Sequence, residues 1–447
     1  MNKKRAKINK KSLVRRQKKL FFREIRSRLK RRLSRKARLP RVIKIKYHLY
    51  NRYYVEKKAQ RARKLEVCTI EIPEKFCFFS NPVVTNEFFE KLNTIFKRRK
   101  PRDIFITHEN TKEISLSASY LFDRIIKEER NYWQKKGIFI RLSGKISRLK
   151  KVNDFLLSFG ILNELGINAE KFSADIVDFD YKDKYFTIKI DGSRLNPTNK
   201  GKASEELAEY FNNCLRHNGF EMNIATKSSL IGIIGEIIGN AEEHCGNNEG
   251  KWHALGCYDK DEHNCSFAII NYGKTFYENL SDEKSTAAEV IARVKAIIDK
   301  QKPLWEKVKG KIFQSQDEEA IWTVMALQDG ISSKRTEFGQ GSTRGQGIMD
   351  VLTFIDAIKS PKKAAEIYLI SGHAEIIIDY TYPIVNKEVG AMKEVRRIIA
   401  FNKAADLHQI PDDKKVIYLE NKLEGTIFAG NFRIDRKYLE ERNKESQ

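Results

Sequence analysis

Cysteine, proline and long apolar runs are scarce in this chain of 447 residues. It has six cysteines and nine prolines. So few cysteines argue against a disulfide scaffold, and no apolar run is long enough to span a membrane. No apolar core of a secretory signal follows the charged N-terminus. These absences predict a cytoplasmic protein without a transmembrane segment, with room for two globular domains and a terminal arm.

Acidic residues are almost absent from the first part of the chain. Residues 1–65 contain 28 Lys and Arg but only two acids, Glu24 and Glu56, so this segment carries the whole formal net charge of +26. Residues 66–447 hold 57 residues of each sign and are neutral. Since a like-charged segment stays solvated or binds an anionic partner, we predict a polybasic arm over 1–65 on a neutral body.

The composition of this arm favours nucleic acid as its partner. Tyrosines at 47, 50, 53 and 54 lie among its cations, and aromatic rings stack on bases while cations neutralise phosphates. The alternatives are an anionic membrane surface, with Phe21 and Phe22 as an apolar anchor, and a flexible tail that aids solubility. The candidate nucleic-acid-binding residues are Lys3, Lys4, Arg5, Arg15, Arg16, Lys18, Lys19, Arg31 and Arg32.

A carboxylate and a carboxamide stand four residues apart in the segment 236–244. Apolar residues at spacings of three and four before and within this segment predict a helix, so Glu236 and Asn240 face the same side. A carboxylate can polarise a water molecule, and an amide oxygen can bind Mg²⁺. Taken alone, such a pair is more typical of a solvated helix edge.

Three glycine-containing motifs follow in order. Residues 267–273 predict a buried strand ending in a glycine turn, and 424–428 a glycine followed by a strand. Between them, four glycines in nine residues, 339–347, lead into an apolar helical pattern. Glycine allows the backbone to approach a ligand closely, and the start of the following helix favours phosphate.

With these four motifs in order, residues 200–435 resemble the GHKL ATPases, which implies a Bergerat fold that binds ATP and Mg²⁺. By this resemblance Glu236 is the catalytic general base and Asn240 the magnesium ligand. Asn271 stands where the family has the aspartate that binds adenine, and Gly273 completes that motif. Asn271 still offers an amide oxygen as acceptor, but without a charge.

The remaining motifs match the parts of the family site that hold the phosphates and the base. Thr426 matches the threonine that helps to hold the base, and the region of about 275–345 matches the nucleotide lid. Helical spacing predicts two lid helices, at 285–300 and 318–328. Lys334 and Arg335 are further candidate phosphate partners. The residues that match the phosphate-binding loop are Gly339, Gly341, Ser342, Thr343, Arg344, Gly345 and Gly347.

Residues 66–170 alternate between strand and helix patterns, which predicts a smaller α/β domain. This order resembles STAS domains, although Ser115 stands at the family's aspartate and Leu116 at its phosphoserine, with Ser117 only a neighbour. The resemblance implies a degenerate STAS-like domain used for contact. The predicted strands are 67–72, 103–107 and 137–142, and the predicted helices are 86–96, 114–127 and 151–160.

Histidines and cysteines cluster in the segment 244–265, which raises the possibility of a zinc site. Their spacing matches no paired-ligand pattern, and Cys257 and Cys265 lie in predicted strands, where a free cysteine behaves as a small apolar residue. The residues concerned are His244, Cys245, His253, Cys257, His263 and Cys265.

The fold class expected is therefore α/β, with residues 171–440 as the GHKL ATPase domain. We expect an ATP-hydrolysing protein that couples its nucleotide state to the nucleic-acid-binding arm, such as a sensor or effector subunit of a bacterial anti-phage complex. The alternatives are a serine or histidine protein kinase of the anti-sigma type and a non-hydrolysing, ATP-switched scaffold. A protein partner or a homodimer is expected in each case.

Overall fold

The computed structural model describes most of the chain after residue 65. The described residues are 66–98, 101–167, 169–178, 180–193, 195–196, 198–243, 251–284, 286–309, 313, 315–331, 347–389 and 394–445. They all belong to one compact unit, Tyr47–Gln447. Among them, no helix combines the length and the apolar character needed to cross a membrane. The arm 1–65 and its nine candidate nucleic-acid-binding residues lie outside the described residues.

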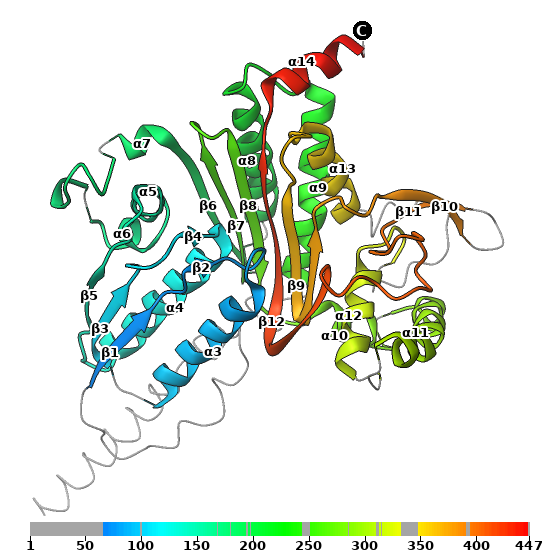
Figure 1. Cartoon of the computed structure of the whole chain (residues 1–447), viewed down its shortest axis with the longest axis horizontal. Coiled ribbons are helices and arrows are strands. Elements are labelled where there is room, and N and C mark those ends of the chain that lie inside the picture. The colour runs from blue at the N-terminus through cyan, green and yellow to red at the C-terminus, as the bar shows by residue number, and fades with distance from the viewer. Residues whose placement is uncertain are drawn as a thin grey trace, which may run out of the picture. The chain divides into compact units, whose positions relative to one another are not determined.

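The first part of the described chain is a parallel three-stranded sheet with helices, in strand order β1-β3-β5 (Figure 1). Helices α3 and α4 connect its successive strands, as right-handed β-α-β units require. The strands are β1 (Glu66–Glu71), β3 (Pro101–Thr107) and β5 (Arg141–Lys145), with a separate short pair, β2 (Lys75–Phe76) and β4 (Glu113–Ile114). The helices are α3 (Pro82–Arg98), α4 (Leu116–Gln134), α5 (Lys150–Ser158), α6 (Ile161–Glu164), η2 (Ala169–Lys171) and α7 (Tyr181–Lys184).

The alternation of strands and helices predicted for this part is confirmed, with one shifted element. The strand predicted at 137–142 begins only at Arg141. Gly137 has a φ of 76° and closes a turn after α4, with its N–H bonded to the Gln134 carbonyl at 2.9 Å. Phe139, which falls in the predicted strand, lies before β5 and is 74% exposed. The apolar pattern therefore predicted this strand correctly but placed its first residue too early.

The second part contains a five-stranded sheet in the order β6-β7-β8-β12-β9, with every neighbouring pair antiparallel. The strands predicted at 267–271 and 426–428 are confirmed within β8 and β12. Successive residues of these strands alternate between two faces. The strands are β6 (Tyr185–Ser193), β7 (Lys251–Asp259), β8 (Asn264–Asn271), β9 (Glu366–Ile378) and β12 (Val416–Arg433).

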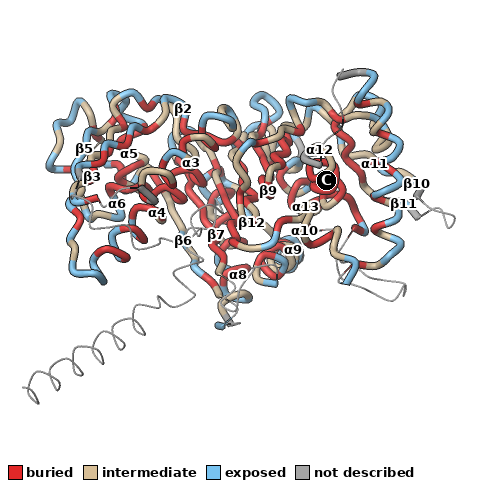
Figure 2. The backbone as a smooth tube through the Cα atoms, turned by 90° about the horizontal axis from the view of Figure 1, so that it is seen from below, coloured by how far each residue is buried: buried red, intermediate tan, exposed pale blue. Residues whose placement is uncertain are grey.

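Both faces of this sheet are covered. Helices α8 (Thr198–Arg216), α9 (Ile224–Glu243) and α13 (Gly347–Ile358) cover the face that we call the inner face, where Trp252 and Phe267 are among the buried side chains (Figures 1 and 2). Helices α3 and α4 contact the opposite, outer face through β12, β7 and β8. Because both faces are packed, β7 and β9 are buried along almost their whole length, whereas β6 is only partly buried.

The predicted lid region forms helices with an apolar core of its own. These are α10 (Phe276–Leu280), α11 (Ala288–Lys309) and α12 (Ser315–Ala326), and the core includes Val294, Ile298 and Trp322. Both predicted lid helices are confirmed, but α11 continues past the expected end through Pro303. A hairpin of β10 (Val385–Val389) and β11 (Glu394–Ile398) and the final helix α14 (Arg436–Glu445) complete the described elements.

Glu375 on β9 is a buried carboxylic acid without a partner. It faces the outer side of the sheet, is fully buried, and neither carboxyl oxygen has a hydrogen-bond partner among the described residues. Burial raises the pKa of Glu375 well above its usual value, because the charged form is poorly solvated there. The folded protein therefore holds a proton at Glu375 that the unfolded chain releases at lower pH.

Replacement of Glu375 by glutamine is expected to remove a pH-dependent loss of stability. A carboxyl group whose pKa is raised on folding makes the folded state less stable as the pH rises, because only the unfolded chain then releases the proton. For each pH unit above the pKa of Glu375 in the unfolded chain, the free energy of unfolding of the parent should therefore fall by about 1.4 kcal/mol relative to that of Glu375→Gln. Urea unfolding of both proteins between pH 4 and 8 measures this slope. The exposed Glu420 on β12 supplies the control, Glu420→Gln, which should leave the slope unchanged. Parallel pH profiles for Glu375→Gln and the parent would contradict the expectation.

Candidate nucleotide-binding site

Helix α9 carries the first of the predicted site residues. The helix spans Ile224–Glu243, and its buried residues Ile234, Ile237 and Ile238 pack against the inner face of the sheet. Asn240 is exposed and Glu236 is half-buried. The spacing of four residues thus places both polar groups along one edge of the helix, as predicted from the sequence.

Asn271 is the last residue of β8 and is buried at 4% exposure. Its side-chain nitrogen Nδ2 donates a hydrogen bond to the Ala241 carbonyl at 3.2 Å. This bond orients the amide so that the oxygen Oδ1 is left to accept from another group. Asn271 is therefore held against α9 through its amide nitrogen.

Thr426 lies beside Asn271 because strands β8 and β12 pair in that register. The preceding residue, Gly425, has a φ of 122°, and a Cβ atom there would lie 2.1 Å from the Asn271 carbonyl oxygen. Only glycine fits both the conformation and the contact. The Gly-Thr pair of the fourth motif is thus explained by the approach of two strands that are distant in the sequence.

Asn240, Asn271 and Thr426 line one cavity of about 40 Å³ on the inner side of the sheet. They come from a helix and two strands, and the sequence analysis assigned all three to one site. The sequence analysis missed the exposed cation Lys274 and α10, which begins at a capping box between Thr275 and Glu278. The other lining residues are Ile237, Ala241, Ile269, Lys274, Phe276, Asn279, Ile348, Leu369 and Phe428.

Glu236 lies against the start of α13. A Cβ atom on Gly347, the first residue of α13, would lie 3.2 Å from the carboxyl carbon of Glu236. With a larger residue at 347, the Glu236 carboxylate would have to shift by a few tenths of an ångström. The N-terminus of a helix presents unpaired N–H groups and a favourable dipole to negative charge. The structure thus brings the first and third motifs together.

Of the other predicted site residues, only Gly273 is among those that the structure describes. Gly273 follows Asn271 but does not line the cavity. His244 and the candidate phosphate partners Lys334 and Arg335 lie outside the described residues. The same applies to Gly339, Gly341, Ser342, Thr343, Arg344 and Gly345.

Arg397 on β11 connects two elements near the site and was not predicted. Its guanidinium binds Asp329 through Nε at 2.8 Å and Nη2 at 3.1 Å, and Nη2 also lies 2.7 Å from Asp350 in the first turn of α13. Such fork-like contacts fix geometry as well as charge. Asp329 precedes the segment 332–346 and Asp350 follows it, so Arg397 ties the two flanks of that segment together. A lone arginine among many in the sequence offers no signal for this role.

The outer face of the sheet carries a second polar group next to the adenine motif. Burial lowers the pKa of His253, and its Nδ1 lies 2.6 Å from Asp191 on β6. Tyr120 of α4 also donates to Asp191, at 3.2 Å, and the His253 ring lies 5.4 Å from that of Tyr272. Tyr272, the middle residue of Asn-Tyr-Gly, therefore faces α4, while Asn271 faces α9.

The described cysteines of segment 244–265 are core residues. Cys257 and Cys265 are buried in β7 and β8, and the Cys265 thiol lies 3.8 Å from that of Cys214. No group of three or more His, Cys, Asp or Glu among the described residues could hold a metal ion.

The start of α4 does not present a free serine at the position expected for a STAS phosphoacceptor. Ser117 is fully buried and its hydroxyl forms a hydrogen bond with Tyr368 on β9. Ser115 is the N-cap of α4 and accepts from the Ala118 N–H at 3.4 Å. Ser117 therefore joins the two parts of the molecule, and Ser115 caps its own helix.

The polar groups of the cavity are of the chemical types that bind ATP and Mg²⁺. Asn240 offers a hard amide oxygen, and Mg²⁺ commonly takes one or two protein ligands and completes its shell with phosphates and water. The cavity volume fits less well, because sites for small molecules usually enclose a few hundred Å³. A nucleotide would have to displace part of the wall, where α10 contributes Phe276 and Asn279.

Comparisons of the chain with protein-family models, with curated proteins and with solved structures find no match.

Proposed function

We propose that the protein binds ATP with Mg²⁺ at the inner cavity and hydrolyses it, as a GHKL-type ATPase with a Bergerat fold. The observation that supports this most directly is that Asn240, Asn271 and Thr426 line one cavity. They belong to motifs separated by up to 186 positions. The second support is the contact between Glu236 and the start of α13, since a helix start next to a carboxylate is suited to phosphate and water chemistry.

Each residue has a defined part in this proposal. The oxygen of Asn271 accepts from the exocyclic amine of adenine, and Thr426 holds the same base from the neighbouring strand. Asn240 would hold Mg²⁺, which neutralises charge on the phosphates. Glu236 takes a proton from the attacking water. The glycine-rich segment 339–347 is assigned to the phosphates on sequence grounds.

In this proposal the polybasic arm binds nucleic acid. The lid helices α10–α12 couple the nucleotide state of the site to the arm. Lid movements of this kind gate many nucleotide sites. A protein kinase is the less favoured alternative, because Ser117 is buried and bonded to Tyr368. A non-hydrolysing scaffold differs from the proposal only in lacking turnover, so turnover decides between them.

Replacement of Asn240 by alanine is expected to abolish magnesium-dependent ATP binding, because the ion loses its protein ligand. Isothermal titration of parent and variant with ATP in the presence of Mg²⁺, and again with a chelator, measures the effect. Asn386→Ala, at an exposed position on β10, is the matched control and should bind as the parent does.

A parent protein that binds no ATP would refute the proposed function. Wild-type affinity in Asn240→Ala would refute the assignment of the magnesium ligand.

A further inference from the structure

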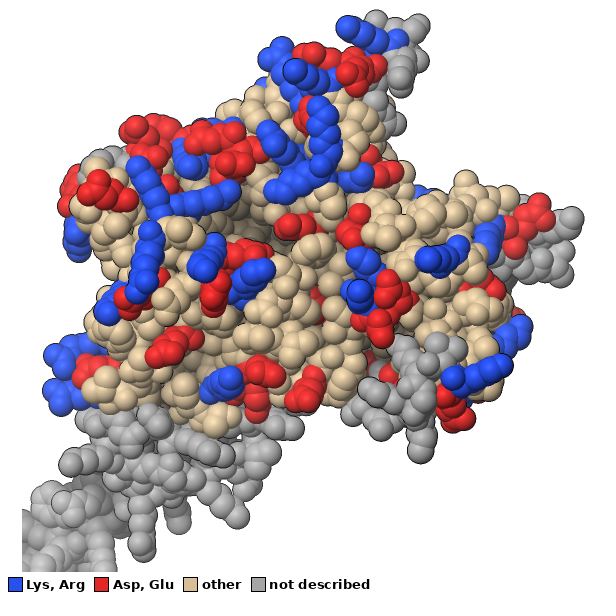
Figure 3. All heavy atoms as spheres, viewed as in Figure 1, with Lys and Arg blue, Asp and Glu red and all other residues tan. Residues whose placement is uncertain are grey.

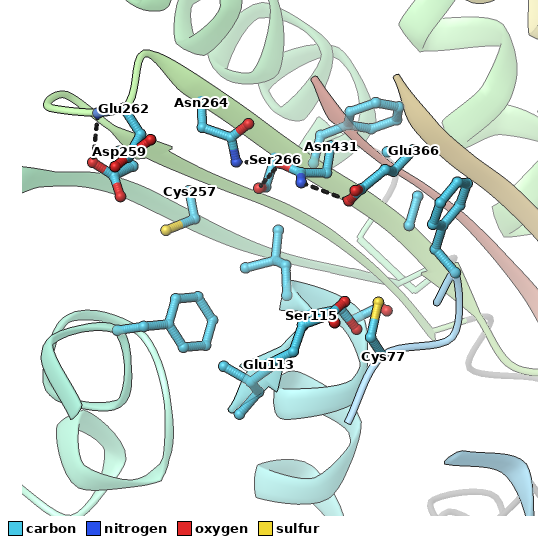
Figure 4. Close-up of a pocket in the computed structure, with 18 of the residues that line it drawn as sticks. Cys77, Glu113, Ser115, Cys257, Asp259, Glu262, Asn264, Ser266, Glu366 and Asn431 are labelled. Carbon is cyan, nitrogen blue, oxygen red and sulfur yellow. Dashed lines mark hydrogen bonds between the residues drawn. The ribbon is translucent and has the colours of Figure 1, made fainter. Parts of the chain in front are cut away.

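A second cavity lies on the outer face of the five-stranded sheet, opposite the face of the candidate nucleotide site. It encloses about 330 Å³ between that face and the start of α4 (Figure 4). A cavity of this size is within the range of small-molecule sites. Its lining includes Ser115, Leu116 and Cys257, which were considered above for other roles, but no residue of this cavity was predicted to bind a ligand together with the others.

One wall of this cavity is a row of polar side chains across four strands. Cys257, Ser266, Asn431 and Glu366 pair in register on β7, β8, β12 and β9. Ser266 donates to Asn431 Oδ1 at 3.0 Å, and Asn431 Nδ2 donates to Glu366 at 2.9 Å. Asn264 also donates to Asn431. The O–H and N–H donors of this wall therefore bond mostly to acceptors within the wall. Its carboxylate oxygens can still accept hydrogen bonds from another group.

Three carboxylates of the cavity are partly or wholly buried, and among the described residues only Asp259 has a cation nearby, Lys184. Glu366 and Glu113 are half-buried and Asp259 is buried. Within the described residues none of the three forms an ion pair. Glu113 accepts from the Ser80 hydroxyl at 2.6 Å, and Asp259 from the N–H groups of residues 261 and 262. Lys184 interacts electrostatically with Asp259, but it forms its ion pair with Asp261, at 3.3 Å.

The lysines that line the cavity do not neutralise these carboxylates from within the cavity. Lys151 and Lys363 are exposed at its rim, and Lys112 pairs with Glu74 at 3.0 Å. Acidic and basic side chains are likewise mixed over the face of the molecule seen in Figure 3. The unpaired negative charge is therefore internal and the positive charge is peripheral, which favours a cationic ligand.

The carboxylates are spread out rather than gathered around one point. No group of described acids converges closely enough to hold a metal ion. Asp259 on β7 and Glu366 on β9 are separated by two strands, which corresponds to about 14 Å. In Figure 4, Asp259 lies at one end of the cavity, Glu366 at the other, and Glu113 on the opposite wall. An extended cation with several N–H donors could contact all three, whereas a single ion could not.

We propose that this outer cavity binds a linear aliphatic polyamine whose ammonium groups contact Glu366, Glu113 and Asp259. Phe155 of α5 and Tyr185 of β6 also line the cavity and supply apolar and aromatic surface for the methylene chain and its charges. Glu113 belongs to the first part of the chain and Glu366 to the five-stranded sheet, so the bound polyamine joins the two. The proposal does not depend on ATP binding.

Titration of the full chain with spermidine tests the proposal, using calorimetry and thermal unfolding at neutral pH. Spermidine should bind saturably, raise the melting temperature as ligand binding to the native state requires, and bind more tightly than the shorter putrescine and ethylenediamine. Glu366→Gln and Glu113→Gln each remove a charge but keep an acceptor oxygen. Each should weaken spermidine binding about tenfold or more, which is the loss of one charge-assisted contact.

Two control variants separate this outcome from general attraction to an acidic surface. Glu205→Gln, at an exposed position on α8, should leave binding unchanged. Lys363→Gln removes a cation at the rim, so this variant should bind spermidine at least as tightly as the parent does. If the cavity bound an anion instead, the same substitution would weaken binding. Absence of saturable spermidine binding would overturn the proposal. Equal affinity in the parent and in both folded glutamine variants of the cavity, with folding checked by circular dichroism, would also overturn it.

Discussion

Replacement of Glu236 by glutamine is expected to slow ATP turnover by about 100-fold or more while ATP still binds. Glutamine has nearly the same shape, so the contact with Gly347 at the start of α13 is kept. It cannot accept a proton from water, however, and the loss of a general base affects the chemical step rather than the binding of substrate. Phosphate release under saturating ATP, with nucleotide affinity measured in parallel, separates the two effects.

The control is Glu205→Gln, on the neighbouring helix α8, which should hydrolyse ATP as the parent does. Turnover at the parental rate in Glu236→Gln would show that another group activates the water. Binding without turnover in the parent itself would instead favour the ATP-switched scaffold. Radioactive phosphate transferred from ATP to protein would favour the kinase.

Deletion of residues 1–65 is expected to remove most of the nucleic-acid affinity and to leave ATP binding intact. The deleted segment carries a formal charge of +26, while the remaining residues sum to zero. A neutral body has no long-range field that would attract phosphate. Each phosphate neutralised by the arm releases counterions and contributes about −0.9 to the slope of log affinity against log salt on duplex DNA.

Titrations of the intact and the truncated protein with labelled DNA and RNA at several salt concentrations measure this effect. The intact protein should lose affinity steeply as salt rises and should show little sequence preference, because Lys and Arg in such an arm contact the backbone rather than base edges. Unchanged affinity after truncation would refute the role of the arm. Binding to anionic vesicles but not to nucleic acid would favour the membrane alternative.

Much of the secondary structure could be predicted because its causes are local. The apolar spacing around Glu236 predicts helix α9, and the alternation between strand and helix patterns predicts β1, β3 and the helices between them. The errors arose where a local pattern competed with something else. Phe139 belongs to an apolar pattern but lies exposed after the turn at Gly137, and α11 continues through Pro303, with Trp305 buried beyond it.

The candidate site was only partly predictable. The spacing of Glu236 and Asn240 places them on one side of a helix whatever surrounds it. The shared cavity of Asn240, Asn271 and Thr426 was expected from the family resemblance alone. Helix α10 has a local signal in its Thr275–Glu278 capping box, but its place at the cavity, like that of Lys274 and the contacts of Arg397, depends on how separate elements pack.

The sequence by itself determined the separation of charge between the arm and the body, the helix that carries Glu236, and the order of the four motifs. These properties depend on composition and on neighbours within a few residues. Only the tertiary structure decided that Gly425 lies against Asn271, that Asn271 and Tyr272 face opposite sides of the sheet, and that the carboxylates of the outer cavity surround one space. Those features depend on strand register and on packing between residues far apart in the chain, where a shift of one residue moves every side chain to the other face.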